Sequence, residues 1–211
     1  MMNSSRQTVR TAASIFAILL LSAAAFAKGE PGSAFPEVRI KNFGQMDERF
    51  YRGAEPKGLE DIRALKHLGI HTVIDLQEKP EPTERGNVES LGMRYVNIPM
   101  VDKAYPRAEW VAAFMQADDD PSTGKFFVHC AGGRHRTGSM GAVYRFEKYG
   151  WGYDQVYAEM KQFDFYTSWG HGDFKTFVQD YARQFESRHH AAPNASAAHV
   201  GSAEGIFAGS H

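Results

Sequence analysis

Cysteine is almost absent from the 211-residue sequence, which contains only Cys130. An exported domain stabilised by disulfides would carry an even number of cysteines, so this thiol is either buried filler or a reactive group. The chain also lacks a strong charge of either sign, since its formal net charge is -1. Nucleic acid is therefore not an expected partner. Beyond residue 21 there is no long apolar run, so the rest of the chain is not expected to enter a membrane.

The first 27 residues have the order of a secretory signal peptide. Arg6 and Arg10 are followed by an apolar run over residues 12–21 and then by small residues that end in Ala-Phe-Ala. A membrane anchor is the alternative, but the run is about half the ~20 residues that a spanning helix needs. We therefore expect residues 1–27 to be removed by cleavage after Ala27. The mature protein should have no stable membrane insertion and should be exported, either periplasmic or secreted.

The last residues differ from the middle of the chain in composition. Residues 189–211 are mainly Ala, Ser, Gly and His with few large apolar side chains. Such a segment cannot bury enough surface to offset its ordering entropy, so we predict a disordered tail, whose histidines would lack the fixed geometry of a metal site. Residues 35–188 remain, and they are long enough for a single domain with one core.

Strand-like and helix-like patterns alternate along this domain. Alternating or β-branched apolar runs predict strands, and apolar residues three or four positions apart predict helices. The order predicts an α/β fold: a central, mostly parallel sheet of four to five strands flanked by helices on both faces. The expected strands are residues 38–43, 49–52, 71–76, 93–98 and 125–129, and the expected helices are residues 59–68, 84–91, 106–116, 137–149, 153–163 and 173–187.

Cys130 lies where a predicted strand passes into a predicted helix, at the edge where open α/β sheets bind ligands. A helix N-terminus and nearby arginines lower the pKa of a thiol, so we expect Cys130 to be a nucleophilic thiolate. Gly132 and Gly133 allow successive backbone N–H groups to turn toward one anion. Arg136 can hold two phosphate oxygens through its planar guanidinium. The stretch therefore predicts attack by Cys130 on a phosphate ester through a phosphocysteine intermediate.

Other residues of this stretch are expected to support the nucleophile. Thr137 follows the arginine, and its hydroxyl can donate to the cysteine sulfur and stabilise the departing thiolate. The side chain of His129 should point away from the loop and order the loop backbone through hydrogen bonds. The expected phosphate-binding residues are Ala131, Gly132, Gly133, Arg134, His135 and Arg136.

The sequence His-Cys-x-x-Gly-x-x-Arg-Thr-Gly at residues 129–138 resembles the signature loop of the protein tyrosine phosphatase superfamily. Residues 50–56 and 68–76 resemble the bacterial dual-specificity branch and the atypical plant and fungal dual-specificity phosphatases. The similarity spans most of residues 47–180. It implies the small dual-specificity phosphatase fold, no metal or organic cofactor, and a phosphorylated protein or small phosphorylated molecule as partner.

The resemblance also implies a general acid, because the superfamily protonates the leaving oxygen from an aspartate on a separate loop. Asp102 is our candidate, since it follows the strand at 93–98 and precedes the helix before the cysteine strand. An ordinary solvated loop aspartate is the alternative interpretation of this residue. Weaker candidates are Asp75 at a strand end, Glu78 and Glu81 in the loop that follows, and Asp118-Asp119-Asp120, which has the pattern of a solvated helix end.

Two other functions stay open at this point. A rhodanese-like sulfurtransferase also has a cysteine between a strand and a helix, although Arg136 and Thr137 at this spacing disfavour it. An inactive module that only binds phosphorylated ligands would typically lack the cysteine or the arginine, and this chain has both.

The substrate is less constrained than the reaction. Phosphotyrosine or another phosphoprotein is expected, with a phosphoinositide or inositol phosphate as the alternative, because Arg134 and His135 add positive charge inside the loop. Residues 169–172 are either a loop near the site or a connector between helices. Four cations in or near predicted loops could add positive charge at the rim of the site, but each singly is interpreted as a scattered surface charge: Arg52, Lys79, Arg85 and Lys103.

Overall fold

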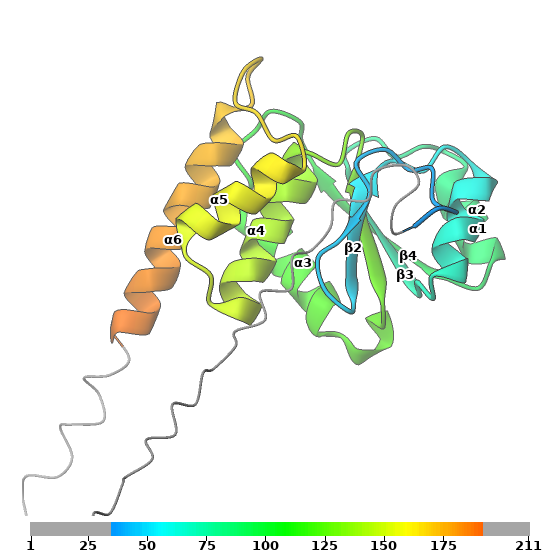
Figure 1. Cartoon of the computed structure of the whole chain (residues 1–211), viewed down its shortest axis with the longest axis horizontal. Coiled ribbons are helices and arrows are strands. Elements are labelled where there is room, and N and C mark those ends of the chain that lie inside the picture. Colours follow the sequence, from blue (N-terminus) through cyan, green and yellow to red (C-terminus); the bar gives the residue numbers. More distant parts are fainter. Residues whose placement is uncertain (1–34, 192–211) are drawn as a thin grey trace, which may run out of the picture.

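The computed structural model describes residues 35–191. The expected signal peptide and residues 192–211 of the expected tail lie outside the described residues. The strands of the described part are β1 (Gly44–Gln45), β2 (Phe50–Ala54), β3 (Thr72–Gln77), β4 (Arg94–Met100) and β5 (Phe126–Cys130). They form one sheet in the order β1-β2-β5-β3-β4 (Figure 1). The pairs β2–β5, β5–β3 and β3–β4 are parallel, whereas β1 runs antiparallel to β2.

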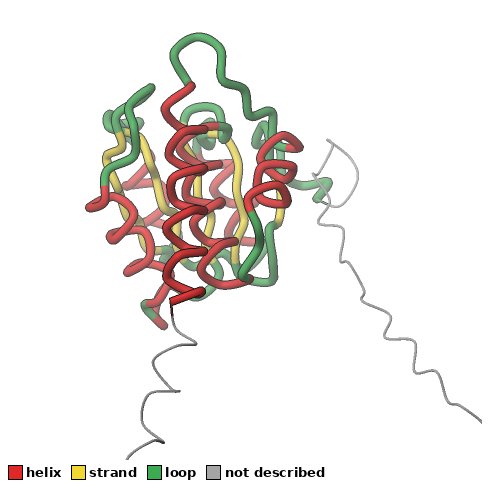
Figure 2. Tube along the Cα trace, turned by 90° about the vertical axis from the view of Figure 1, so that its left-hand side faces the viewer, coloured by secondary structure: helices red, strands yellow, loops and turns green. Residues whose placement is uncertain are grey.

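Helices cover both faces of this sheet (Figures 1 and 2). One face carries α1 (Leu59–His67) and α2 (Glu84–Ser90), and the other carries α3 (Ala108–Asp119), α4 (His135–Tyr149), α5 (Tyr153–Gln162) and α6 (Gly172–Ala191). A single turn of 3-10 helix at Pro121–Thr123 leads from α3 toward β5. The predicted fold class, a mostly parallel sheet between two helical layers, is confirmed.

Side chains of the central strands alternate between two buried apolar clusters. Val73 and Phe127 belong to the cluster beneath α1 and α2, whereas Ile74 and Val128 belong to the larger cluster beneath α3 to α6. This period of two carries through to the end of β5, because successive residues of a strand face opposite sides. Cys130 therefore lies on the α4 side of the sheet, and the preceding His129 lies on the α2 side.

The first strand is the clearest difference from the sequence expectation. Residues 38–43 were expected to be a strand, but they are irregular, and the strand is limited to Gly44–Gln45. The apolar side chains that produced the pattern are nevertheless buried, and Asn42 interrupts the extended backbone with a left-handed φ of 55°. The reversal follows β1 rather than falling at Gly44, and the Asp47 carboxylate accepts two N–H groups within it.

The remaining elements lie within a few residues of their predicted bounds. The final helix, α6, extends to Ala191, three residues past the expected end of the domain at residue 188. The fold therefore delivers the end of β5 and the start of α4 to one edge of the sheet, as the sequence predicted.

Candidate active site

A small cavity opens at the carboxyl end of β5, where the chain turns into α4. Its volume is about 140 Å³. Nine residues line it: Asp102, Cys130, Ala131, Gly132, Arg134, His135, Arg136, Tyr166 and His171. The structure thus gathers most of the predicted site in one place. Thr137 and Gly133 are the predicted site residues that do not line the cavity.

The Cys130 thiol is only 4% exposed. Burial by itself raises its pKa, because it disfavours the charged form. The Arg136 guanidinium, the nearby Thr137 side chain and the N–H groups of Thr137 and Gly132 act in the opposite direction and outweigh burial. The pKa of Cys130 is therefore lowered from its ordinary value, which is the condition for a thiolate nucleophile.

Arg136 is held in place by groups from the end of β4 and the loop that follows. Its Nη1 donates to the carbonyl oxygen of Met100 at 3.3 Å, and its Nη2 lies 3.8 Å from Oδ1 of Asp102. The arginine side chain is 10% exposed, whereas the aspartate side chain is 52% exposed. The carboxylate is thus at the mouth of the cavity and the guanidinium is inside it.

Asp102 is the one carboxylate among the described residues that lines this cavity. Asp75 is fully buried and already accepts the Tyr95 hydroxyl at 2.7 Å, so it has no access to a substrate. Glu78 and Glu81 are exposed and do not line the cavity.

The interpretation of residues 118–120 as a solvated helix end is wrong for its first member. Asp118 is 1% exposed and lies 3.0 Å from Nζ of Lys148 and 3.6 Å from Nη1 of Arg49. Burial raises its pKa against the effect of these two cations. Asp118 faces the core because it falls on the inner side of α3, in line with Phe114 one turn earlier.

The loop backbone is fixed from behind by two side chains. Gly133 has a left-handed φ of 65°, and its carbonyl oxygen accepts Nη2 of Arg52 at 2.8 Å and Nδ2 of Asn42 at 3.0 Å. The same Asn42 amide group donates to the carbonyl of Phe163 at 3.0 Å. These contacts hold the carbonyl away from the cavity, so neighbouring N–H groups are free to face an anion.

Neither of these two side chains was expected at the site. Arg52 was interpreted as a scattered surface cation, and that interpretation is wrong because Arg52 is 1% exposed. The strand alternation around Arg52 was the available signal, since a residue in the middle of a central parallel strand is buried on either face. Asn42 had no signal in the sequence.

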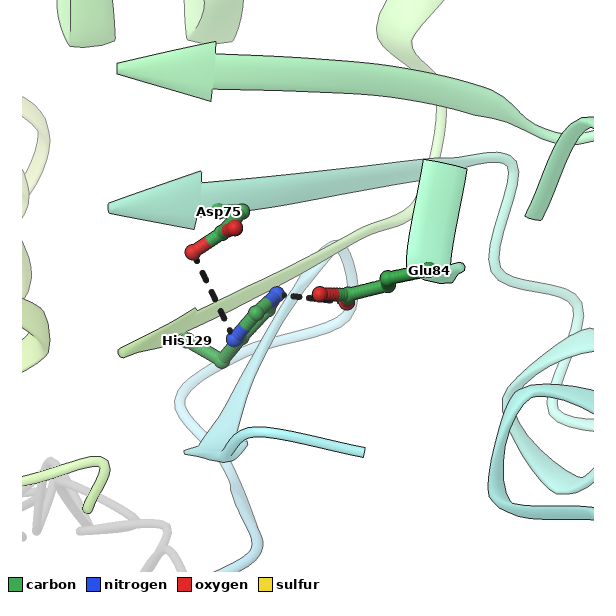
Figure 3. Close-up of side chains that lie close together, drawn as sticks. All are labelled: Asp75, Glu84 and His129. Atoms are coloured by element: carbon green, nitrogen blue, oxygen red, sulfur yellow. Dashed lines mark ion pairs between the residues drawn. The ribbon is translucent and has the colours of Figure 1, made fainter. Parts of the chain in front are cut away.

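His129 lies between two carboxylates, those of Asp75 and Glu84 (Figure 3). Its Nε2 is 2.8 Å from Oε1 of Glu84, and its Nδ1 is 3.8 Å from Oδ1 of Asp75. Burial lowers the pKa of His129, but the two carboxylates outweigh burial and raise it. The ring was expected to order the loop backbone, and the structure corrects this: it links β5 to α2 and β3. One ligand atom from each of these three residues lies within 4.8 Å of the others, a spacing that a metal ion could bridge, but here the two ring nitrogens face the two carboxylates instead.

His135 lines the cavity, and its predicted part in binding phosphate stays a prediction. Its ring stacks on His171 with centroids 3.7 Å apart, and its Nε2 donates to the carbonyl of Tyr166 at 3.0 Å. Burial and the neighbouring His171 lower the pKa of His135 to about 4. The ring is therefore uncharged near neutral pH, and the expected extra cation at this position is wrong. The contact does answer the open question about residues 169–172, because it brings this loop to the cavity.

Comparison with known proteins identifies the family. Residues 47–192 match a family described as "Swiss Army Knife protein, DSP-PTPase phosphatase domain" (PTP-SAK). This match covers more than half of the chain. The protein belongs to this phosphatase family. The sulfurtransferase alternative is thereby disfavoured, and the PTP-SAK domain is a phosphatase of the protein-tyrosine and dual-specificity type.

Individual relatives of the PTP-SAK domain agree with this assignment. The "Putative tyrosine-protein phosphatase OCA1" of Mycosarcoma maydis is 27% identical over 129 residues, covering 58% of this chain and 79% of the relative. P. aeruginosa TpbA has a TM-score of 0.62 at 23% identity, with 82% of this chain and 99% of TpbA covered. The core catalytic domain of the S. cerevisiae PP-IP phosphatase SIW14 has a TM-score of 0.56 at 18% identity, with 73% and 96% covered. The two solved structures show that the fold is shared.

Proposed function

We propose that the protein hydrolyses phosphate monoesters in two steps through a phosphocysteine at Cys130. The observation that carries this proposal is the setting of the sulfur, which lines the cavity beside Arg136 and has a pKa below its ordinary value. Attack on a bound phosphate dianion requires a thiolate of this kind, together with fixed donors for the charge on the equatorial oxygens.

In the first step the thiolate attacks phosphorus, an S–P bond forms, and the P–O bond to the leaving group breaks. Asp102 then donates a proton to the leaving oxygen. This role is supported by the half-exposed position of Asp102 at the mouth of the cavity, where the leaving group emerges. In the second step water attacks phosphorus, Asp102 accepts the proton of that water, and the S–P bond breaks. The hydroxyl of Thr137 stabilises the released thiolate.

The test uses the fact that the chain has one cysteine. Cys130→Ser should abolish turnover of 4-nitrophenyl phosphate while its far-UV circular dichroism stays that of the wild type. In the wild type, rapid acid quenching should trap labelled phosphate on residue 130. Turnover by the serine variant would reject the proposal. A folded wild type that binds inorganic phosphate without any turnover would instead be the inactive binding module.

For the substrate we propose phosphotyrosine in proteins as the first class. The support is that a cysteine-to-serine variant of P. aeruginosa TpbA has been solved in complex with pTyr, with a TM-score of 0.59 to this chain. A small molecule with several phosphates is the second class, favoured by Arg134, which lines the cavity together with Arg136. Relative kcat/KM values on phosphotyrosine peptides, phosphoinositides and inositol phosphates, with Cys130→Ser as the blank, decide between the classes.

We further propose that the enzyme acts outside the cytoplasm, in the periplasm or after secretion. The support is the basic, apolar and small-residue order of residues 1–27. Among the described residues no helix is long and apolar enough to cross a membrane. Mass spectrometry of the mature protein should find Lys28 at the N-terminus. A full-length chain recovered from the cytoplasmic fraction would contradict the proposal.

A further inference from the structure

Arg52 is a buried cation directly behind the loop of residues 131–134, which joins β5 to α4. It stands in β2, one residue before Gly53 and two before Ala54, which pair with His129 and Cys130 of β5. Its side chain is 1% exposed, and its Nε has no hydrogen-bond acceptor among the described residues. Burying a guanidinium in this way is costly unless negative charge is close to it. The position therefore calls for a counter-charge.

The immediate surroundings of the guanidinium are shaped to hold it. The group lies over the ring of Phe163, 4.0 Å from its centroid, and its Nη2 donates to the Gly133 carbonyl. Gly138 and Gly141 leave space for it on the inner side of α4, since a Cβ on either would lie within 4 Å of its terminal nitrogens. This is also beside the first turn of α4, where the positive end of the helix dipole adds to the cost.

Two negative groups act on this cation. Glu159 and Cys130 both oppose the effect of burial and of Arg145 on the pKa of Arg52, which is lowered to about 10. Glu159 is itself held by Arg145, whose Nη2 lies 2.6 Å from Oε1 and whose Nε donates to both oxygens. The carboxylate of Glu159 is therefore paired with Arg145, and it acts on Arg52 through its charge. The other negative group that acts on Arg52 is Cys130 when its sulfur is ionised.

We propose that Arg52 is a positioning residue for the phosphatase reaction: it fixes the Gly133 carbonyl and supplies a buried positive charge that keeps Cys130 ionised. Arg136 contacts the phosphate from the cavity, whereas Arg52 acts on the sulfur and the loop from the opposite side. The proposal rests on the proposed function of Cys130 as nucleophile, and it adds a second arginine to the one that the signature motif contains.

The experiment titrates Cys130 directly and does not depend on turnover. The full chain is alkylated with iodoacetamide over a range of pH, and only one thiol can react. Arg52→Met removes the charge and keeps an unbranched side chain, so the midpoint of the alkylation rate should rise by about one pH unit. Arg52→Lys keeps the charge but lacks the planar guanidinium group. Its midpoint should rise much less, while inorganic phosphate should inhibit the alkylation of Cys130 several-fold less well, because the loop is less firmly held.

Arg49→Met is the matched control. Arg49 lies just before the opposite end of β2, where it donates to the carbonyls of Gly124 and Asp118. Its loss should lower thermal stability and leave the alkylation midpoint unchanged. A merely structural role for Arg52 predicts the same outcome for Arg52→Met, so a folded variant with the wild-type midpoint overturns the proposal.

Two further outcomes are informative. If Arg52→Met does not fold, Arg52→Lys decides, and a wild-type midpoint together with wild-type phosphate inhibition overturns the proposal. The proposed function fails separately, if Cys130→Ser keeps its activity. The alkylation result stands in that case, because it measures the thiol and not the reaction.

Discussion

Adding a single methyl group at Gly133 should separate the loop from the strand behind it. Gly133 has a φ of 65°, and a Cβ placed on it would lie 2.5 Å from the carbonyl oxygen of Gly53 and 2.7 Å from the backbone nitrogen of Ala54. Both contacts are with backbone atoms of β2, so no side chain can rotate away to relieve them. Gly133→Ala therefore forces the loop and the strand apart.

The expected loss of stability in Gly133→Ala has two parts. A left-handed conformation costs an alanine about 1–2 kcal/mol, and a backbone shift forced by overpacking costs about 1–3 kcal/mol. The total is about 3 kcal/mol, which corresponds to a fall in Tm of about 9 °C for a domain of this size. A displacement of the loop by about 1 Å should also lower kcat/KM about 100-fold, because the donors no longer meet the phosphate.

Gly150→Ala is the control that isolates the conformational part. Gly150 ends α4 with a φ of 62°, and a Cβ there would meet nothing within 4 Å. It should lose about 1 kcal/mol, or about 3 °C in Tm, with full activity. Differential scanning calorimetry and aryl phosphate kinetics on both variants provide the comparison. Equal losses in Tm and unchanged kcat/KM for Gly133→Ala would refute the claim that contact with β2 shapes the loop.

Three further predictions concern substitutions of acidic residues described above. Asp102→Ala should slow alkyl phosphates about 100-fold more than 4-nitrophenyl phosphate, because a good leaving group needs no proton; equal slowing would remove Asp102 from the role of acid. Glu84→Ala should destabilise the fold by about 3 kcal/mol by leaving a buried charge on His129. The pKa of His129 is raised in the folded protein, so the stabilisation by the Glu84–His129 pair is present below pH 6.5 and is lost as pH rises through the folded pKa. Urea melts should therefore show a smaller loss of stability from Glu84→Ala at pH 9 than at pH 6. Asp47→Asn should cost about 2 kcal/mol at pH 7, since the carboxylate accepts two tyrosine hydroxyls and two N–H groups. Burial raises the pKa of Asp47, but these bonds lower it overall, so the contribution is present above about pH 4 and is lost as pH falls through the folded value. A penalty that does not shrink as the pH falls below 4 would contradict this.

The parts of the site that are contiguous in sequence could be predicted from it. The strand, the glycines and Arg136 are local, and their roles follow from the spacing between the cysteine and the start of α4. Asp102 also lies in its expected loop, because the order of strands places the end of β4 near the end of β5. Its chemical role is not tested by this placement.

The parts that depend on distant contacts could not be predicted. Arg52 was interpreted as a surface charge because its environment is created by Phe163 and Gly133, which are far from it in the chain. The charge state of His135 depends in the same way on a stack with His171, and sequence spacing alone contains no information about that contact. The burial of Asp118 likewise depends on Lys148 of another helix.

The Gly133 carbonyl is a meeting point for segments that lie far apart along the chain. Asn42 reaches it from before the sheet begins, Arg52 from a strand, and the Asn42 amide group also holds the chain end of α5 at Phe163. The signature sequence at residues 129–138 therefore does not determine the shape of its loop by itself. Transplanted into another strand-to-helix turn, it would keep its nucleophile and lose the scaffold that shapes the anion nest. For the same reason, a natural copy of the motif in which residues 42 and 52 have been replaced is a poor candidate for an active enzyme, however intact its signature.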